Sequence, residues 1–266
     1  MPELPEVETV VRELKVLEHC LISNIEIFWP RSIEGSNQNF SKKIAGTQLT
    51  QLFRRGKYLV FETNGDFSFT VHLRMTGKLI FKPAEKDLPY VRVRLDFSDG
   101  QKLYFVDVRK FGRWKLWPKS QALLPDLGLE PLDKKSILKA LTGLKTQREI
   151  KKVLLDQRIL AGVGNIYADE ALFAAKINPC RPAHSLTPSN IQALAIAIPS
   201  ILKASIKNMG TTLSDYRNTK NMGGENQHYL KVYGQTGIAC GTCGSIIQKI
   251  LLGQRGCHFC PSCQEN

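Results

Sequence analysis

Residues 91–106 read VRVRLDFSDGQKLYFV, and their pattern is the clearest indication of the fold of the first half of the chain. Polar and apolar residues alternate over 91–97, a second β-rich run covers 102–106, and Ser-Asp-Gly lies between them, which is typical of a β-hairpin. Similar short runs occur at 22–28, 58–62 and 67–71. Six or more strands within about 95 residues predict a β-sandwich or a flattened barrel.

Helical patterns lie on both sides of this β-rich region. Residues 3–18 repeat leucine and valine at helical spacing, which predicts one amphipathic helix. A stretch rich in proline, from Pro118 to Pro131, predicts a linker, and a mobile polar loop is expected over 218–228. Pro199 is expected to kink or split its helix. Between linker and loop we expect helices at about 134–143, 147–156, 165–176, 188–207 and 211–217.

These patterns predict an α+β protein with three domains. The first, residues 1–125, is a β-sandwich with a leading helix. The second, residues 126–234, is helical and contains the loop. The third, residues 235–266, is a cysteine-rich module.

The composition points to a polyanionic partner. The 266 residues contain 37 Lys+Arg against 24 Asp+Glu, a formal net charge of +13. Basic residues cluster over 102–119 and 134–152, and these runs predict a positive groove that binds nucleic acid. Acids stand where a signal peptide would have basic residues, and no apolar run reaches about 18 residues. We therefore expect a soluble, intracellular protein that does not contact a membrane.

The cysteines predict a metal site. Five of the seven lie after residue 239, and the pairs Cys240-Gly-Thr-Cys243 and Cys260-Pro-Ser-Cys263 place four thiolates at the spacing of a tetrahedral Zn²⁺ site. A module of about thirty residues has too small a core to fold without such a staple. Cys257 also stands at knuckle spacing from Cys260, but Pro261 suits the turn of the second pair. We expect one structural zinc and a spare thiol at Cys257.

The residue after the start methionine can act as a nucleophile. Loss of Met1 would leave Pro2 as an N-terminal secondary amine, which forms an iminium with an aldehyde-like carbon, and Glu3 and Glu6 stand nearby to move protons. The alternative is that Pro2 is only a first-turn helix residue, followed by acids that suit the helix dipole. The first residues alone favour this structural interpretation.

Other motifs suit contacts with DNA. The Gly-rich turn before Asn165 predicts a helix N-terminus, with Asn165 as its N-cap, that can seat a phosphate. Met75 and Phe111 lie among basic residues, as expected of apolar wedges between bases, although each taken singly is more often a core residue. Arg255 is expected at a hairpin tip, within reach of a phosphate or as a solvated turn residue. Glu170 is expected to be a structural ion-pair member.

Taken together, the motifs resemble the bacterial formamidopyrimidine-DNA glycosylase family, over nearly the whole chain. The resemblance is carried, in order, by MPELPEVET at 1–9, RRGKY at 54–58, HLRMTG at 72–77, DVRKFG at 107–112, GVGNIY at 162–167, GTT at 210–212, VYG at 232–234 and the four-cysteine tail with Arg255. It implies an N-terminal β-sandwich, a helix–two-turn–helix domain and a zinc β-hairpin finger.

The resemblance also implies the activity. The enzyme would remove oxidised purines, 8-oxoguanine and formamidopyrimidines, from damaged double-stranded DNA in base-excision repair, and then cleave the strand by β,δ-elimination. It would be a monomer in the bacterial cytoplasm, associated with the nucleoid when bound to DNA. Its implied catalytic residues are Pro2 as nucleophile, Glu3 as general acid/base, Glu6 as support, Lys57 in β-elimination and Arg255 in δ-elimination or phosphate binding.

The remaining implied residues contact DNA. His72, Asn165 and Tyr233 would bind phosphates, while Met75, Arg109 and Phe111 would fill the gap left by the extruded nucleotide. The loop 215–229 would fold over the extruded base. The chain has Tyr90 where the family usually has His, only Lys145 and Arg148 flank a position where lysine is common, and Cys257 replaces Thr. We count Tyr90, Lys145 and Arg148 among the DNA contacts.

Two alternatives have distinct signatures. The sister endonuclease VIII type shares the fold and chemistry but removes oxidised pyrimidines; the N-terminal motif and the Met75/Arg109/Phe111 trio favour the purine enzyme. A non-catalytic zinc-dependent DNA-binding protein would make Pro2 a helix residue and would leave Glu3 and Lys57 without a role.

Overall fold

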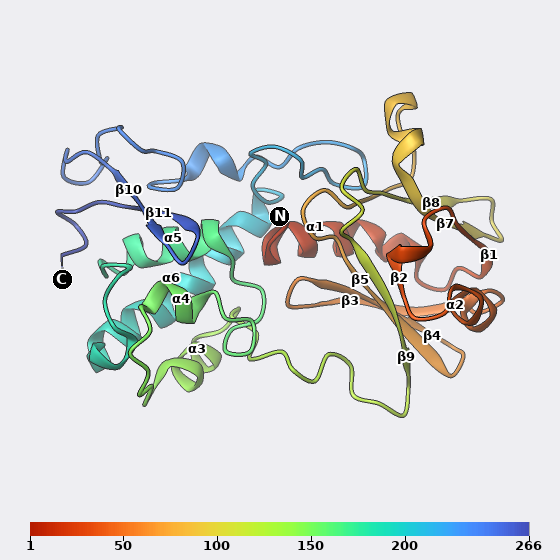
Figure 1. Cartoon of the computed structure of the whole chain (residues 1–266), viewed down its shortest axis with the longest axis horizontal. Coiled ribbons are helices and arrows are strands. Elements are labelled where there is room, and N and C mark those ends of the chain that lie inside the picture. The colour runs from red at the N-terminus through yellow and green to blue at the C-terminus, as the bar shows by residue number, and fades with distance from the viewer. Residues whose placement is uncertain (266) are drawn as a thin grey trace. The chain divides into compact units, whose positions relative to one another are not determined.

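A computed structural model describes residues 1–265, which fold as two compact units (Figure 1). Unit 1 comprises Met1–Pro125 and Asn208–Glu225, and unit 2 comprises Asp126–Lys207 and the residues from Asn226 onward. The segment 208–225, which lies inside the expected helical domain, therefore packs with the β-rich part of the chain. The finger belongs to the same unit as the helices.

Unit 1 begins with one short helix and contains two sheets. Helix α1 spans Leu4–Leu14 and continues as a 3₁₀ turn over Lys15–Leu17, close to the expected helix. The hairpin expected at 91–106 is confirmed as β7 and β8, which pair from Val91↔Val106 to Asp96↔Lys102. The first sheet has the order β1 (Ile22–Ile27), β7 (Val91–Phe97), β8 (Lys102–Val106), β6 (Lys78–Ile80).

The second sheet contains the strands that contact helix α1. Its order is β2 (Ile33–Glu34), β9 (Arg113–Pro118), β5 (Phe67–His72), β4 (Tyr58–Thr63), β3 (Leu49–Arg55). Helix α2 (Asn37–Ile44), which the strand-rich pattern hid, is capped by Ser36, whose Oγ accepts from the backbone N of Asn39 at 3.2 Å.

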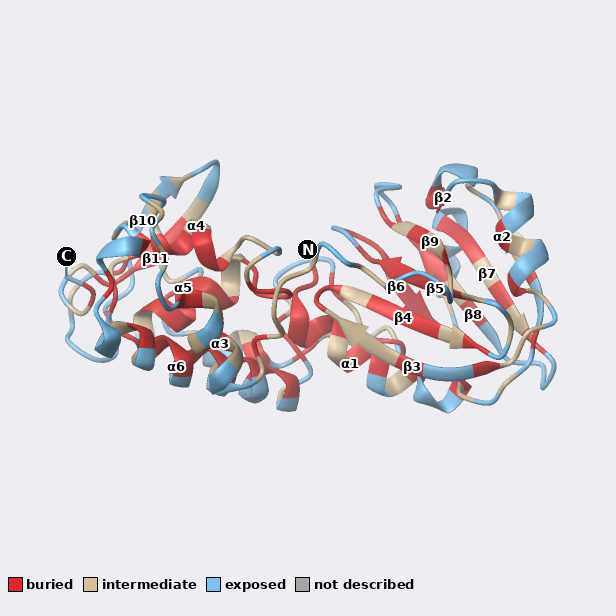
Figure 2. Cartoon of the chain, turned by 90° about the horizontal axis from the view of Figure 1, so that it is seen from below, coloured by how far each residue is buried: buried red, intermediate tan, exposed pale blue. Residues whose placement is uncertain are grey.

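The core of unit 1 is built from both sheets. Buried residues of β4, β5, β7 and β9 line the interior (Figure 2), and the rings of Phe61, Phe69 and Trp114 stack with centroids 4.6 and 5.6 Å apart. Phe40 of α2 meets the edge of this stack. These three rings belong to the second sheet, and Phe105 of β8 in the first sheet meets the Trp114 ring at a centroid distance of 5.7 Å. The aromatic cluster therefore packs the two sheets together as a β-sandwich, and burial of each such side chain stabilises the fold by about 1.5–3 kcal/mol.

Unit 2 is helical with one β-hairpin. Its helices are α3 (Lys134–Leu141), α4 (Ile150–Leu154), α5 (Asn165–Ala174) and α6 (Pro188–Lys207), and its hairpin is formed by β10 (Gln248–Leu252) and β11 (Arg255–Phe259). Helix α6 includes Pro199 without being split. The helix expected at 211–217 is wrong, since that segment is irregular. Short 3₁₀ turns complete the chain at Pro30–Ser32, Glu85–Tyr90, Ala183–Ser185 and Asn226–Tyr229.

Helix α6 is strongly apolar. By length and composition alone it could cross a membrane, with a mean hydropathy of 1.2 over 18 residues, although its uninterrupted apolar runs are far shorter than 18 residues. Core helices of soluble proteins meet the same criterion. In this fold α6 packs on α3 and α5 and buries Leu194, Ile198 and Leu202. Its hydropathy is therefore explained by the core of unit 2.

Candidate active site and nucleic-acid interface

The start of α1 places the residues expected to be catalytic in a buried setting. Pro2, Glu3 and Glu6 are all buried, and Glu3 is the N-cap residue of the helix. The backbone N of Glu3 donates to the Glu6 Oε2 at 2.7 Å, as in a capping box. The same hydrogen bond therefore caps the helix and holds the backbone next to Pro2 in place.

The carboxylate of Glu6 also binds the segment 208–225. Its Oε1 accepts from the backbone N of Thr211 at 2.7 Å. Gly210, with φ +81°, makes this approach feasible, because a Cβ there would come within 2.9 Å of the same oxygen. Tyr216 inserts its ring into the core of unit 1, and its hydroxyl donates to the Met209 carbonyl at 3.2 Å. These contacts explain why 211–217 is not a helix.

The turn between β3 and β4 places Lys57 next to His72. Lys57 is buried, and the residue after it, Tyr58, pairs directly with His72 on β5. Arg54 ties this turn to α1 through an ion pair with Glu8 at 3.0 Å. Burial, Arg74 and Lys57 lower the pKa of His72 to about 3, and its Nδ1 accepts from the Arg74 backbone N at 2.9 Å. His72 is therefore neutral and its Nε2–H is the donor that it can offer.

Two loops present the residues expected to fill the gap in DNA. Met75 and Phe111 are 40% and 50% exposed, so neither is a core residue. The Arg109 Nη1 approaches the Met75 Sδ at 3.5 Å. Both loops are held by the fully buried Asp107, which accepts from the Thr76 hydroxyl and, at 2.7 Å, from the Gly112 backbone N. The residues expected to act as wedges thus lie on two loops that share the Asp107 carboxylate.

Tyr90 lies beside these loops. Its side chain is exposed, its ring lies 5.8 Å from the Arg92 guanidinium, and its carbonyl accepts from the Asp107 backbone N at 2.9 Å. Tyr90 therefore borders the strand end that precedes Arg109.

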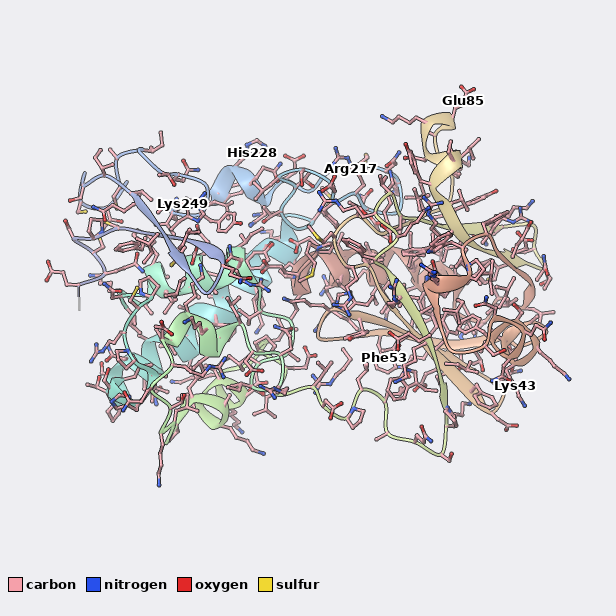
Figure 3. All side chains as sticks on the ribbon, viewed as in Figure 1. Lys43, Phe53, Glu85, Arg217, His228 and Lys249 are labelled. Atoms are coloured by element: carbon pink, nitrogen blue, oxygen red, sulfur yellow. The ribbon has the colours of Figure 1, made fainter. Side chains whose placement is uncertain are left out.

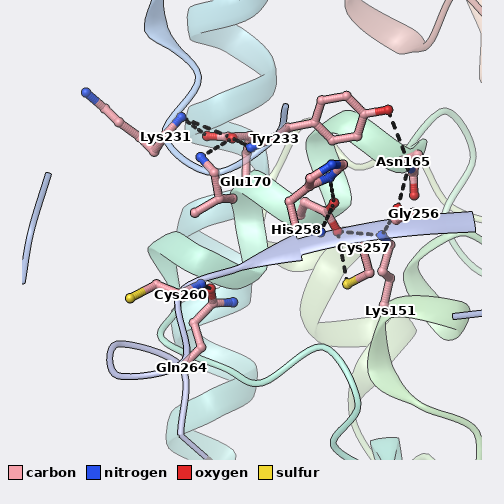
Figure 4. A network of polar contacts seen from close by, with 12 residues as sticks. Lys151, Asn165, Glu170, Lys231, Tyr233, Gly256, Cys257, His258, Cys260 and Gln264 are labelled. Carbon is pink, nitrogen blue, oxygen red and sulfur yellow. Dashed lines mark hydrogen bonds and ion pairs between the residues drawn. The ribbon is translucent and has the colours of Figure 1, made fainter. Parts of the chain in front are cut away.

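In unit 2, α5 and the finger hairpin share a buried polar network (Figure 4). Asn165 is the first residue of α5, and Gly164 is the N-cap, so the expected cap role of Asn165 is wrong. Its Nδ2 donates instead to the Gly256 carbonyl at 3.0 Å and reaches the Tyr233 hydroxyl at 3.4 Å. A phosphate that displaced the long Tyr233 contact would find an oriented amide donor.

Two adjacent acids of α5 hold the segments around Asn165. Asp169 pairs with the fully buried Lys151 at 2.6 Å and accepts from the His258 backbone N at 2.8 Å. Glu170 accepts from the backbone N of Tyr233 at 2.8 Å and from those of the two preceding residues. Burial raises the pKa of Glu170, and these donors oppose the shift. Glu170 is structural, but through backbone bonds and not through an ion pair.

Arg255 borders a hollow lined with basic side chains. It is the first residue of β11, while Gly253 and Gln254, both with positive φ, form the hairpin tip that was expected to include it. The hollow has a volume of about 390 Å³ and is lined also by Arg148, Lys152 and Arg158. Asp156 pairs with Arg148 at 3.0 Å and with Arg158 at 3.1 Å. Lys145 is exposed on the preceding loop.

The four expected metal ligands are brought together. The sulfur atoms of Cys240, Cys243, Cys260 and Cys263 all lie within 4.8 Å of one another, which fits the sulfur–sulfur distance of about 3.8 Å in a tetrahedral zinc site. Backbone N–H groups of Thr242 and Cys263 approach two of the sulfurs at 3.4 Å. Cys257 is separate: its buried thiol lies 3.6 Å from Asp169, and burial together with that carboxylate raises its pKa to about 12.

Sequence reasoning missed two positioning acids in unit 1. Asp107 was part of a quoted motif but had no assigned role, and Glu13 was not singled out at all. Glu13 binds Asn218 and Thr219 of the segment 208–225. An acid in the last turn of a helix, where the dipole disfavours it, is the signal that could have drawn attention to Glu13. Arg217, on the same segment, is labelled in Figure 3; its Nη1 donates to the Tyr216 carbonyl.

A β-sandwich with a buried, acid-flanked N-terminal proline and a helical unit with a four-cysteine hairpin define a class of zinc-finger proteins. Known family models match in the same order. The formamidopyrimidine-DNA glycosylase N-terminal domain matches residues 1–114, the formamidopyrimidine-DNA glycosylase H2TH domain 127–217, and the zinc finger found in FPG and IleRS 237–266.

Full-length relatives agree. The formamidopyrimidine-DNA glycosylase of Herpetosiphon aurantiacus is 43% identical over 99% of this chain and 100% of its own, and that of Enterococcus faecalis is 42% identical over 100% and 98%. The solved complex of Lactococcus lactis Fpg with DNA containing an abasic site has a TM-score of 0.88 at 40% identity, covering 99% of this chain and 100% of that one. The chain belongs to the formamidopyrimidine-DNA glycosylase family.

Proposed function

We propose that Pro2 is the nucleophile with which this protein releases oxidised purines from duplex DNA. As a member of its family the protein is a DNA glycosylase of base-excision repair with associated lyase activity. The single observation that supports the residue assignment is the buried N-terminal cluster of Pro2, Glu3 and Glu6. Relatives solved with an abasic site and with Fapy-dG in DNA support the substrate class.

The reaction needs the Pro2 amine to be unblocked, so Met1 must first be removed. The Pro2 nitrogen then forms a bond to C1′ of the damaged nucleotide while the bond from C1′ to the base breaks and the base leaves with a proton. Glu3 is positioned at the helix cap to protonate the ring oxygen as the sugar opens to the iminium. Lys57 would remove the 2′ proton, and the 3′ phosphate would leave in β-elimination. Arg255 would promote loss of the 5′ phosphate in δ-elimination, or hold the flanking phosphate.

The DNA contacts follow from donors and exposed apolar groups. His72 offers a neutral N–H to a phosphate, and Asn165 and Tyr233 offer an amide and a hydroxyl. Met75, Arg109 and Phe111 would occupy the space of the extruded nucleotide, which offsets an extrusion free energy of about a few kcal/mol. Tyr90, Lys145 and Arg148 would add contacts to the backbone. Cys240, Cys243, Cys260 and Cys263 would hold one Zn²⁺ that stabilises the finger.

Trapping the covalent intermediate tests the assignment. The protein, shown by mass spectrometry to lack Met1, is incubated with a duplex carrying 8-oxoguanine opposite cytosine and reduced with borohydride. We expect a covalent complex for the wild type and none for Pro2→Gly. The matched control Pro83→Gly changes a half-buried loop proline outside the N-terminal cluster and should trap normally. The absence of a wild-type complex, or its persistence in Pro2→Gly, would contradict the proposal.

The same experiment with a thymine-glycol duplex distinguishes the endonuclease VIII type of specificity. Faster trapping on thymine glycol than on 8-oxoguanine would assign pyrimidines as substrates. We further propose that the protein acts as a monomer in the bacterial cytoplasm, on nucleoid DNA and without membrane contact. Sedimentation of the free protein at about 30 kDa would support the monomer.

A further inference from the structure

Helix α1 contacts the segment 208–225 at two points along one face. Glu6 and Glu13 are seven residues apart, which places both carboxylates on the same side of the helix, two turns from each other. Glu6 accepts from Thr211, near the start of the segment, and Glu13 accepts from residues near its middle. Only the first of these two acids belongs to the N-terminal cluster assigned to catalysis.

Three donors converge on the carboxylate of Glu13. Its Oε2 accepts from the Thr219 backbone N at 2.8 Å and from the Thr219 hydroxyl at 2.7 Å, while its Oε1 accepts from the Asn218 Nδ2 at 3.0 Å. Asn218 and Thr219 are themselves 1% and 3% exposed. A carboxylate in the last turn of a helix is disfavoured by the helix dipole, so these donors supply the compensation that this position needs.

The residues that follow form a tight turn around Asn218. The Asn218 Oδ1 accepts from the backbone N of Lys220 at 3.1 Å and of Met222 at 2.9 Å, and the Asn218 backbone N donates to the Met222 carbonyl at 2.9 Å. Lys220 and Met222 are exposed. The turn 218–222 therefore turns its polar groups inward and presents these two side chains outward.

A second anchor holds the far side of the turn. Lys78 pairs with Asp87 at 2.8 Å, and both contact the Asn221 side-chain amide at 3.3 Å. Burial alone would raise the pKa of Asp87, but the hydrogen bond and charge of Lys78 outweigh it and lower that pKa. With Glu13 on one side and this pair on the other, the 218–222 turn has a defined position, although the loop was expected to be mobile.

We propose that Glu13 is a positioning residue for damaged-base recognition: it fixes the 218–222 turn, and so governs release of the base without taking part in strand cleavage. The inference rests on the proposed function, in which residues 215–229 cover the extruded base. A site that has already lost its base gives the turn nothing to recognise. Base release and cleavage at an abasic site should therefore separate in variants of Glu13.

The test compares two duplexes that differ only at the lesion, one with 8-oxoguanine opposite cytosine and one with an abasic site, under single-turnover conditions. We expect Glu13→Gln to slow base release about tenfold, the effect of losing one charge-assisted hydrogen bond. Abasic-site cleavage should stay within about twofold of wild type. Glu26→Gln is the matched control: it removes the same charge from the ion pair of Glu26 with Arg94 on β7, and should change neither rate.

Thr219→Val provides a milder variant that keeps the side-chain shape and the backbone donor. It should slow base release about threefold, and the double variant should slow it less than the product of the two single effects. If Glu13→Gln does not fold, as judged by circular dichroism, the rates of base release and abasic-site cleavage in Thr219→Val test the inference. Equal slowing on both duplexes, or no slowing on either, would overturn the inference.

The proposed function fails separately. If the wild type forms no borohydride-trapped complex with the abasic duplex, then the proposed function and the inference fall together. If the wild type traps normally, the ratio of the two rates in the variants bears on Glu13 alone.

Discussion

Helices α1 and α5 both use two carboxylates to hold distant parts of the chain, but in different ways. On α1 the acids are seven residues apart, share a face and hold one segment at two points. On α5, Asp169 and Glu170 are adjacent, so they point about 100° apart and hold two segments, β11 and residues 231–233. Asp169 also pairs with the buried cation of Lys151.

The different arrangements of these acids correspond to different ways in which each unit is held together. In unit 1, helix α1 holds the segment 208–225, and a core that contains stacked aromatic rings stabilises the sandwich. Unit 2 has a small hairpin that needs both a polar hub beneath it and, in our proposal, a metal at its far end. We therefore expect a substitution in unit 1 to destabilise only its surroundings. A substitution in unit 2 should destabilise the hairpin and the polar network beneath it together.

Removing a zinc ligand should have the largest effect. In Cys243→Ser we expect bound zinc to fall from about one per chain to near zero, because a structural site of this type contributes about 10–16 kcal/mol of apparent binding free energy. Metal analysis and hydrogen exchange of β10–β11 would measure this. Cys20→Ser, at a cysteine outside the cluster, is the control. Full exchange protection of β10–β11 without zinc would mean that the polar network of Asp169, Lys151 and Asn165 is sufficient to hold the hairpin.

Breaking the buried ion pair should have the next largest effect. Lys151→Met leaves the Asp169 carboxylate buried without its cation, which should lower the free energy of unfolding of unit 2 by about 3–5 kcal/mol. The neighbouring Lys152→Met, whose lysine is partly exposed and pairs with Glu149, should lower it by less than about 1 kcal/mol. Urea denaturation followed by circular dichroism would compare them. Equal losses in the two variants would show that burial of the pair has no special role.

The smallest expected effect is a pH dependence confined to unit 1. His72 has its pKa lowered to about 3, so between about pH 6.5 and 3 the unfolded chain binds a proton that the folded chain does not. Stability of unit 1 should thus fall as pH falls, by about 1.4 kcal/mol from pH 6.5 to 5.5 at most.

The measurement can be restricted to that unit. All three tryptophans, Trp29, Trp114 and Trp117, lie in unit 1, so their fluorescence during urea denaturation reports on it. His72→Gln should reduce the slope of stability against pH. An unchanged slope in this variant would assign the effect to other groups.

Local patterns made much of the fold predictable. The alternation at 91–97 and the Ser-Asp-Gly turn predict the β7–β8 hairpin, and the cysteine spacing predicts the ligand cluster, because each depends on residues close in sequence. The resemblance of the N-terminal motif pointed to the family in the same way.

Long-range contacts were not predictable. The irregular course of 211–217 depends on Glu6 and on the insertion of Tyr216 into a distant core, both of which override the local helical pattern. Asn165 was expected to cap its helix, but its side-chain amide donates to the carbonyl of Gly256, 91 residues away. Glu13 has its partners 205 and 206 residues further along, so no local pattern could connect them.

The division of unit 1 into Met1–Pro125 and Asn208–Glu225 has a consequence during biosynthesis. The acids of α1 are made first, yet their partners on the second segment follow about 205 residues later, a delay of roughly 10–40 seconds at ordinary translation rates. During that interval the sandwich can form, but the segment that we assign to damage recognition does not yet exist. The nascent chain therefore acquires the segment that discriminates damaged bases only after its nucleophile and its sandwich have been made.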